Sequence, residues 1–383
     1  MLKTLNIMSS EGKYRRPPPG LEEIKTVAID RTHGGVGANG INDFSASINP
    51  LGPPQAALDE YHAAAAAIGS YPPAYSERLT ERIAEWLGIT SKEVIVGNGS
   101  THLIHLFARV YQLRVPYVAI PTFSEFANAL ALSDCTPYAL ELSRTHSFTI
   151  RLADIEQAMR HRAQAVFIGR PNSPTGSMVP LHVAEEIARE CEHFHAFCVF
   201  DEAFIDFADR RESAITLMRT VPERRRKGLV VIGSLTKIFA IPGLRVGFLA
   251  GPSRVIEELR NYLEPWSLNI VAERVALACL ERAEEFTRHT REWLAIERSY
   301  FAERLSRIGG IQVFPSAANF LMLEADERLR PTTFGDFMLT QGIAVRDLRA
   351  MPGCEAGLYR VAVLQREHNI RLVAAARAYA SKL

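Results

Sequence analysis

Hydrophobic and polar positions alternate along the middle of the chain as short apolar runs separated by amphipathic stretches. The apolar runs predict buried strands at residues 93–96, 116–120, 137–142, 164–169, 196–200 and 229–232. Apolar residues at helical spacing predict helices around and between them, at 55–67, 76–87, 101–111, 124–133 and 181–193. Strands that alternate with helices are typical of a mainly parallel sheet covered by helices on both faces. The pattern therefore predicts an α/β fold.

The pattern changes at both ends of this region. Beyond residue 255 it indicates long helices, interrupted at 265–269, and then shorter strands near 311–314, 319–323, 343–346 and 358–363. Near the start, the run Arg-Arg-Pro-Pro-Pro-Gly at 15–20 is compatible with neither a helix nor a central strand. We expect an N-terminal arm (1–50) that contributes to the small domain and the active site, a large domain (51–264) and a small C-terminal domain (265–383).

Polar turns follow four of the predicted strands. They are Gly97–Thr101, Asn172–Gly176, Asp201 and the stretch from Ser234 to Lys237. Ligands of parallel sheets bind at the carboxyl ends of the strands, where such turns meet. Three of these turns also have a structural interpretation: a glycine turn without a ligand at 97–101, a helix cap or ion pair at Asp201, and a surface lysine at 237. Four turns at one predicted edge favour a shared site.

The chemistry of two of these residues depends on burial. Lys237 comes just after a buried strand, and burial lowers the pKa of an amine until it can act as a nucleophile or base. Asp201 directly follows an apolar run, where an unpaired carboxylate is unfavourable, so it should face a cation.

Composition narrows the function classes. The 383 residues are 47% hydrophobic and 23% charged, with a net charge of +1, which indicates no nucleic-acid or membrane-surface partner. No apolar run has the length of a membrane span, and the first residues lack the apolar core of a secretory signal. The five cysteines form no C-x-x-C pair, which argues against a disulfide framework or a structural zinc site and for a reducing cytoplasm.

Several motifs together resemble a known family. A strand-end Asp201, Lys237 in Ser-x-x-Lys, Arg245 eight residues later, N-x-PTG and GNGST resemble fold-type I pyridoxal-phosphate enzymes of the class I and II aminotransferase superfamily. Within it, the chain resembles the branch of histidinol-phosphate aminotransferases and L-threonine-O-3-phosphate decarboxylases. The motifs HGG, DFSxSINPLG, DEAFIDF, SLTKxFAIPGLR, PWSxN and YRVAV are most similar to the decarboxylases of cobalamin biosynthesis. The resemblance implies a seven-stranded large domain and a smaller α+β C-terminal domain.

The resemblance implies pyridoxal 5'-phosphate as the cofactor and no metal. Lys237 would form the Schiff base with its aldehyde, and Asp201 would pair with the protonated ring nitrogen. Phe123 would stack on the ring, and Phe204 replaces a tyrosine that hydrogen-bonds the cofactor in related aminotransferases. The phosphate would be held by five residues, namely Gly99, Ser100, Thr101, Ser234 and Arg245.

The family's NNPTG motif is altered here, because it reads Asn172-Ser173-Pro174-Thr175-Gly176. The residue before proline usually contacts the cofactor or substrate. Either Asn172 turns inward or the Ser173 hydroxyl takes that role.

The resemblance also implies the substrate and subunit contacts. Arg346 and Arg360 would bind the anionic ends of the substrate, with His33 and Gly34 at its phosphate. Ser47 stands where the decarboxylase pattern has a substrate-contacting asparagine, which leaves threonine phosphate and serine phosphate both open. The family forms homodimers with shared active sites, so Tyr71 would reach the cofactor of the neighbouring subunit.

The expected function is decarboxylation of O-phospho-L-threonine to (R)-1-aminopropan-2-yl phosphate and carbon dioxide in cobalamin biosynthesis. Alternatives are an aminotransferase for histidinol phosphate or a related amino acid, and a decarboxylase of O-phospho-L-serine. A cofactor-binding regulator or silent scaffold is a further alternative, and the presence of Lys237, Asp201 and Arg245 argues against it.

Overall fold

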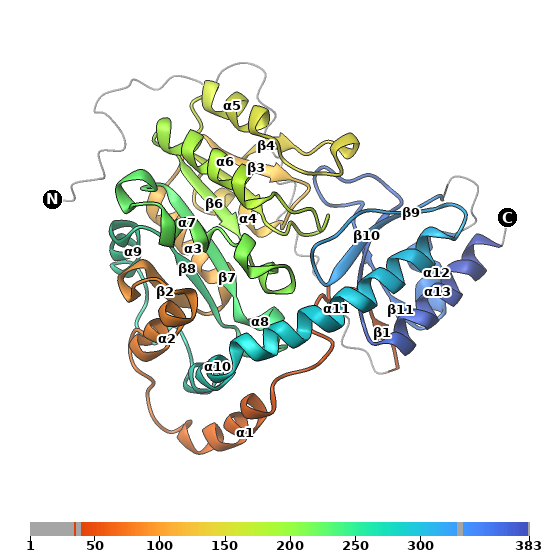
Figure 1. The fold of residues 1–383 in the computed structure, drawn as a ribbon, viewed down its shortest axis with the longest axis horizontal. Coiled ribbons are helices and arrows are strands. Elements are labelled where there is room, and N and C mark those ends of the chain that lie inside the picture. The colour runs from red at the N-terminus through yellow and green to blue at the C-terminus, as the bar shows by residue number, and fades with distance from the viewer. Residues whose placement is uncertain (1–33, 36–39, 328–331, 382–383) are drawn as a thin grey trace.

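The structure, a computed structural model, describes residues 34–35, 40–327 and 332–381 of the chain. Within these residues the largest sheet has seven strands in the spatial order β2-β8-β7-β6-β5-β3-β4 (Figure 1). They are β2 (Val94–Gly97), β3 (Pro116–Ile120), β4 (Tyr138–Glu141), β5 (Ala165–Gly169), β6 (Phe197–Asp201), β7 (Leu229–Ser234) and β8 (Gly247–Ala250). β8 is antiparallel to both of its neighbours, whereas β7, β6, β5, β3 and β4 pair in parallel. The predicted mainly parallel α/β sheet is confirmed.

Alternate side chains of the central strands pack into two hydrophobic cores, one on each face of the sheet. Along β7, Val230 and Ile232 belong to the core formed with α3 (Gly99–Tyr111), α4 (Glu125–Ala131) and α9 (Ser253–Arg260). Leu229 and Val231 belong to the core completed by α2 (Glu77–Leu87), α5 (Leu152–Arg160), α6 (Leu181–His193) and α7 (Ile215–Thr220). Successive strand residues point to opposite faces, so burial on both sides explains why the strands are continuous apolar runs.

A smaller C-terminal sheet domain follows α10 (Ile270–Glu281) and the long helix α11 (Ala283–Ser306) (Figure 1). Its four-stranded antiparallel sheet has the order β12-β13-β10-β9. The strands are β9 (Ile311–Val313), β10 (Phe320–Ala325), β12 (Arg346–Asp347) and β13 (Leu358–Ala362), accompanied by α12 (Phe334–Thr340) and α13 (Arg366–Ala380). The short strand β1 (Asn42–Asp43) pairs in parallel with β11 (Ile343–Ala344), which places residues from near the N-terminus against this domain. The boundaries at 50 and 264 stay predictions.

The structure differs from the predicted pattern at several elements. β8, α5 and α7 were not predicted from the sequence. β8 has four residues and pairs antiparallel with β7. The connection between the two strands contains no long helix, so β8 breaks the alternation of strands and helices. The predicted helix 55–67 ends earlier as α1 (Gln55–Ala64), and its last residues form a 3-10 turn.

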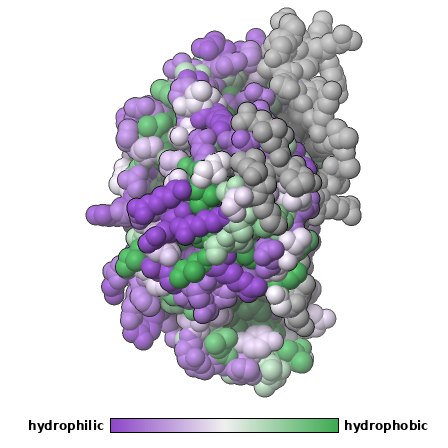
Figure 2. Space-filling model, turned by 90° about the vertical axis from the view of Figure 1, so that its right-hand side faces the viewer, coloured by the Kyte–Doolittle hydropathy of each residue, from purple (hydrophilic) through white to green (hydrophobic). Residues whose placement is uncertain are grey.

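The surface shown in Figure 2 is mainly hydrophilic. On the face that carries the smaller domain, hydrophilic residues predominate and apolar residues form small separate patches (Figure 2). Among the described residues, no helix combines the length and apolarity needed to span a bilayer. All five cysteines are free.

Candidate active site

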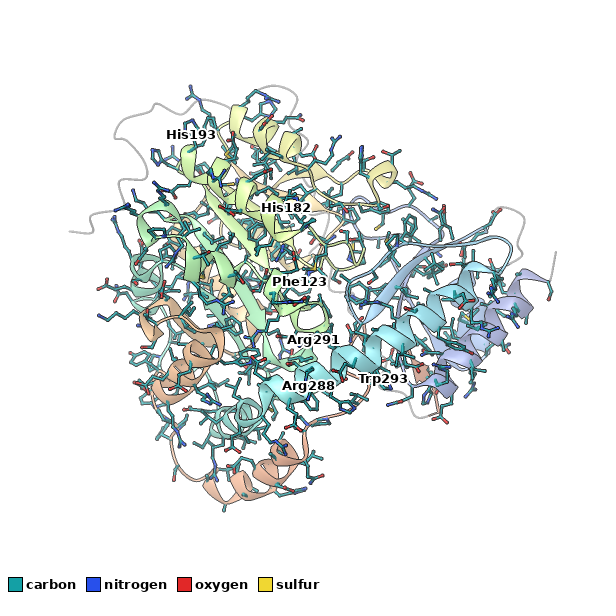
Figure 3. All side chains as sticks on the ribbon, in the orientation of Figure 1. Phe123, His182, His193, Arg288, Arg291 and Trp293 are labelled. Carbon is teal, nitrogen blue, oxygen red and sulfur yellow. The ribbon has the colours of Figure 1, made fainter. Side chains whose placement is uncertain are left out.

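A cavity of about 590 Å³ lies where the carboxyl ends of the large-sheet strands face the smaller domain. The predicted strand-end turns meet in it, since its wall on the side of the large sheet includes Ser100, Thr101, Phe123, Ser173, Asp201, Phe204, Ser234 and Lys237. The opposite wall includes Gly34, Ser47, Arg346 and Arg360. Phe123 lies near the centre of the molecule, between the large sheet and the smaller domain (Figure 3). Segments far apart in the sequence therefore form one cavity.

Lys237 stands on a one-turn helix, α8 (Leu235–Ile238), that begins directly after β7. Leu235 and Ile238 are fully buried and anchor this turn in the core. The backbone N–H of Asn49 donates to the Lys237 carbonyl at 3.1 Å, and its side-chain amide donates to the Ile238 carbonyl at 2.7 Å. Burial and the nearby Arg360 and Arg245 lower the pKa of Lys237 to about 8. A substantial fraction of this amine is therefore neutral and nucleophilic near neutral pH.

Asp201 is the last residue of β6 and projects into the cavity. Its Oδ1 accepts the backbone N–H of Ala203 at 2.9 Å. Burial and the neighbouring Glu202 raise the pKa of Asp201 to about 6, against the opposing effects of the Ala203 N–H and Lys237. Among the described residues, no cationic side chain lies within 4.0 Å of this carboxylate, and Lys237 is the cation whose charge acts on it from farther away. A cationic ligand group placed at Asp201 would stabilise its charged form.

The turn between β2 and α3 forms a cradle for an anion. Gly99 opens the 13-residue helix α3 with a left-handed φ of 79°, and a Cβ on it would lie 2.6 Å from Nη2 of Arg245. Arg245 itself has a φ of 58°, which turns it toward this helix start. Ser234 and Thr236 exchange a hydroxyl hydrogen bond of 2.7 Å at the same wall. Free N–H groups, a guanidinium and hydroxyls at one helix N-terminus suit a phosphate.

Two arginines face the cavity from the smaller domain. Arg346 on β12 and Arg360 on β13 are directly opposite each other in the antiparallel ladder. Nη1 of Arg360 donates to Ser173 Oγ at 2.8 Å and Nη2 donates to the Ser45 carbonyl at 2.7 Å, while its buried Nε has no hydrogen-bond partner among the described residues. Burial and Arg346 lower the pKa of Arg360 to about 10. Like charges held opposite each other are unfavourable, so this wall is suited to anionic groups of a ligand.

The two residues before Pro174 lie in different surroundings. The Asn172 amide donates to the Pro121 carbonyl at 2.8 Å and to Thr175 Oγ1 at 3.0 Å, and its Oδ1 accepts from Thr122 at 2.6 Å. Asn172 does not line the cavity, whereas Ser173 does. This difference favours Ser173 as the residue that contacts a ligand, and the contact stays a prediction.

Of the remaining predicted residues, some line the cavity and others do not. Ser47 is buried in the cavity wall, and its hydroxyl has no hydrogen-bond partner in the part of the chain that the structure describes. Phe204 packs edge-on against Phe320, with ring centroids 5.1 Å apart. Gly99 lies behind the cavity wall, next to Arg245. Tyr71 is 83% exposed, packs on Trp266 and does not line the cavity of its own chain. His33 lies outside the described residues.

Other cavity residues were not singled out from the sequence. Thr122, Glu125 and Thr236 flank predicted residues, so their place just after strands β3 and β7 was a usable signal. Ser45 lies within the quoted motif DFSxSINPLG. Met351 lies in a loop of the smaller domain that carries no pattern, and only the fold places it in the cavity.

Curated relatives of this chain include both decarboxylases and aminotransferases. A protein of Caldanaerobacter subterraneus subsp. tengcongensis, provisionally named threonine-phosphate decarboxylase, is 32% identical over 342 residues, covering 86% of this chain and 88% of its own length. The threonine-phosphate decarboxylase of Salmonella typhimurium is 30% identical over 348 residues (90% and 92%). A histidinol-phosphate aminotransferase of C. subterraneus subsp. tengcongensis is 28% identical over 313 residues (81% and 84%).

Solved structures show the same fold. The histidinol-phosphate aminotransferase of Clostridium acetobutylicum matches with a TM-score of 0.82 at 24% identity, over 90% of this chain and 100% of the other. The L-threonine-O-3-phosphate decarboxylase of Porphyromonas gingivalis matches with a TM-score of 0.77 at 20% identity, over 89% and 100%. The model of the family "Aminotransferase class I and II" matches residues 39–375. The chain belongs to the class I and II aminotransferase family, whose members are enzymes that depend on pyridoxal phosphate.

Proposed function

We propose that this chain is a pyridoxal-phosphate-dependent decarboxylase. Its substrate would be O-phospho-L-threonine and its products (R)-1-aminopropan-2-yl phosphate and carbon dioxide, in cobalamin biosynthesis. Support comes from the motifs in the sequence and from the two most similar relatives described above. The observation that carries the choice of substrate is the facing pair Arg346 and Arg360, opposite Lys237.

The residues of the cavity fit the cofactor. Asp201 is a buried carboxylate that makes no ion pair with any described side chain, as a protonated ring nitrogen requires, and the start of α3 with Arg245 forms a cradle for the phosphate. Phe123 offers a ring face at the cavity wall. When bound, pyridoxal phosphate supplies an aldehyde for covalent attachment and a ring that accepts electrons from a bond broken at the substrate Cα.

The protein's own groups supply binding, orientation and proton transfer. Of the lysines that the structure describes, Lys237 alone lines the cavity, and its lowered pKa allows it to give or take a proton at the substrate Cα. Asp201 would hold the charge of the ring nitrogen. Arg360, fixed by Ser173 and Ser45, would hold the substrate carboxylate or phosphate in one orientation.

The charge of the cavity favours anionic ligands. Among the described residues, the titratable side chains that line the cavity are cationic Lys237, Arg245, Arg346 and Arg360 and acidic Glu125 and Asp201. Four cations against two acids leave an excess of two positive charges. The cofactor phosphate would use Arg245, and the anionic groups of the substrate would use Arg346 and Arg360.

The runner-up is an aminotransferase acting on histidinol phosphate. The curated aminotransferase relative is almost as similar as the decarboxylases. Histidinol phosphate carries a phosphate but no carboxylate, so it would leave one arginine of the facing pair unused. In addition, Phe204 cannot donate the hydrogen bond that a tyrosine offers the cofactor in related aminotransferases.

A substrate panel separates these activities. The purified protein with pyridoxal phosphate is incubated with O-phospho-L-threonine, O-phospho-L-serine or histidinol phosphate plus 2-oxoglutarate. We expect carbon dioxide from the first substrate and no keto product from the third. Glutamate formation from histidinol phosphate without carbon dioxide from either phospho-amino acid contradicts the proposal.

We further propose a cytoplasmic homodimer with shared active sites, in which Tyr71 reaches the cofactor phosphate of its neighbour. Tyr71 is exposed on the chain's own surface next to Trp266, where a second copy could cover it. Replacing Tyr71 with Phe should weaken cofactor binding in the dimer. Mixing Tyr71→Phe with Lys237→Ala subunits should restore one active site per mixed dimer, and no recovery contradicts shared sites.

A further inference from the structure

Asp201 has a buried ion pair immediately behind it. The next residue, Glu202, is 2% exposed, and its Oε1 accepts from Nη1 of the fully buried Arg170 at 2.6 Å. Neither Glu202 nor Arg170 lines the cavity. Consecutive residues at a strand end point to opposite sides, so Asp201 faces the cavity while Glu202 faces the protein interior.

Both members of the pair are fixed by further hydrogen bonds. Glu202 also accepts from Ser213 Oγ at 2.5 Å and from the Ala214 N–H at 2.8 Å. Arg170 directly follows β5, its Nε donates to the Val179 carbonyl at 2.8 Å, and its backbone N–H donates to the Asp201 carbonyl at 2.7 Å. Arg170 therefore contacts Asp201 through the main chain and Glu202 through the side chain.

This arrangement matters because two carboxylates adjoin in a buried region. Like charges disfavour each other's ionised form, most strongly where water is excluded. Among the described residues, the charged groups that act on Asp201 are Glu202 from its own strand end and Lys237 from α8. Arg170, from the end of β5, is the cation that neutralises Glu202.

We propose that Arg170 is a positioning residue for Asp201: by pairing with Glu202 it fixes the end of β6 and keeps Asp201 available as a carboxylate for the cofactor's ring nitrogen. The inference rests on the proposed cofactor site but not on which substrate reacts. It assigns a role to Arg170 and Glu202 in cofactor binding although neither touches the cavity.

The test compares two variants of the same ion pair. One removes its cation and the other removes its anion. Arg170→Met removes the positive charge behind Asp201 while Ser213 and Ala214 still donate to Glu202, so binding of pyridoxal phosphate should require a higher pH. Glu202→Gln leaves the Arg170 charge beside Asp201, so binding should persist to a lower pH. The readout is the dissociation constant of pyridoxal phosphate for the apoprotein as a function of pH. The pH midpoint of binding should move by roughly one unit from the wild-type value, upward in Arg170→Met and downward in Glu202→Gln.

A purely structural role would weaken binding at every pH without moving the midpoints apart. Glu212→Gln is the matched control, because Glu212 lies 3.8 Å from Nη2 of Arg170 but is partly exposed and does not adjoin Asp201 in the chain. Its midpoint should equal that of the wild type. If Arg170→Met does not fold, Glu202→Gln decides alone: an unchanged or raised midpoint overturns the inference. If the wild-type apoprotein does not bind pyridoxal phosphate at all, the proposed function fails as well, so the two failures are distinguishable.

Discussion

Arg360 donates from Nη1 to the hydroxyl of Ser173 over 2.8 Å, although the two residues are 187 positions apart in the chain. The hydrogen bond joins the smaller domain to the turn after β5. It fixes one arm of a guanidinium whose Nε has no hydrogen-bond partner within residues 34–35, 40–327 and 332–381. Ser173 thus orients the arginine to which we assign an anionic group of the substrate.

Replacing Ser173 with Ala should therefore raise KM for O-phospho-L-threonine about tenfold, because a hydrogen bond to a charged group contributes about 1.5–3 kcal/mol. The effect on kcat should be smaller, since Arg360 keeps its bond to the Ser45 carbonyl. Ser177→Ala is a matched control in the same turn, because Ser177 donates to the Phe148 carbonyl instead. Equal KM values for Ser173→Ala and the wild type would show that this bond does not serve substrate binding.

Lys237 should be indispensable. In Lys237→Ala the covalent attachment of pyridoxal phosphate and its visible absorbance should be lost, together with activity. Lys227→Ala, ten residues earlier on the exposed surface, should behave like the wild type. Absorbance of bound cofactor that survives in Lys237→Ala after denaturation would assign the attachment to another lysine.

The pH dependence of cofactor attachment follows from the lowered pKa of Lys237. The neutral amine attacks, so the attachment rate should rise with pH and level off above about 8. Arg360 lowers the pKa of Lys237 as a like charge, so Arg360→Met should move this midpoint to higher pH. Stopped-flow absorbance gives both profiles, and a midpoint that falls in Arg360→Met contradicts the electrostatic account.

Asp201 should limit the stability of the apoprotein. Its folded-state pKa of about 6 exceeds the ordinary value of 3.8, so ionisation of Asp201 destabilises the fold. This penalty is complete above pH 6 and disappears as the pH falls below 3.8. Asp201→Asn should stabilise the apoprotein at pH 7 by at most about 3 kcal/mol and lose this advantage at low pH. Denaturant unfolding at several pH values measures the difference. A less stable Asp201→Asn apoprotein at pH 7 would mean that the carboxylate has a cation partner after all.

Gly99 should be needed for the phosphate cradle. In Gly99→Ala the new methyl group would lie 2.6 Å from Nη2 of Arg245, and the left-handed backbone at this position adds strain. The guanidinium must move, so affinity for pyridoxal phosphate should fall about tenfold or more. Gly309→Ala is the control, because nothing lies within 4 Å of its added carbon. Equal cofactor affinities would place the phosphate elsewhere.

The sequence predicts what lies close along the chain or at strand ends. Lys237, Ser234 and Asp201 follow buried strands, and parallel pairing brings the ends of β6 and β7 together. It does not reveal partners that depend on three-dimensional contact. Arg170 and Glu202 are 32 residues apart, and neither lies in the cavity. The choice between Asn172 and Ser173 depends on side-chain direction within one turn, which no hydrophobic pattern encodes.

The central claim is that the bond broken is the one between Cα and the carboxylate. O-phospho-L-threonine labelled with ¹³C at the carboxyl carbon tests this most directly, with the holoenzyme and with Lys237→Ala as the control. We predict labelled carbon dioxide and (R)-1-aminopropan-2-yl phosphate in equal amounts from the wild type and none from the variant. Label retained in a keto acid, formed only when an amino-group acceptor is supplied, would contradict the account.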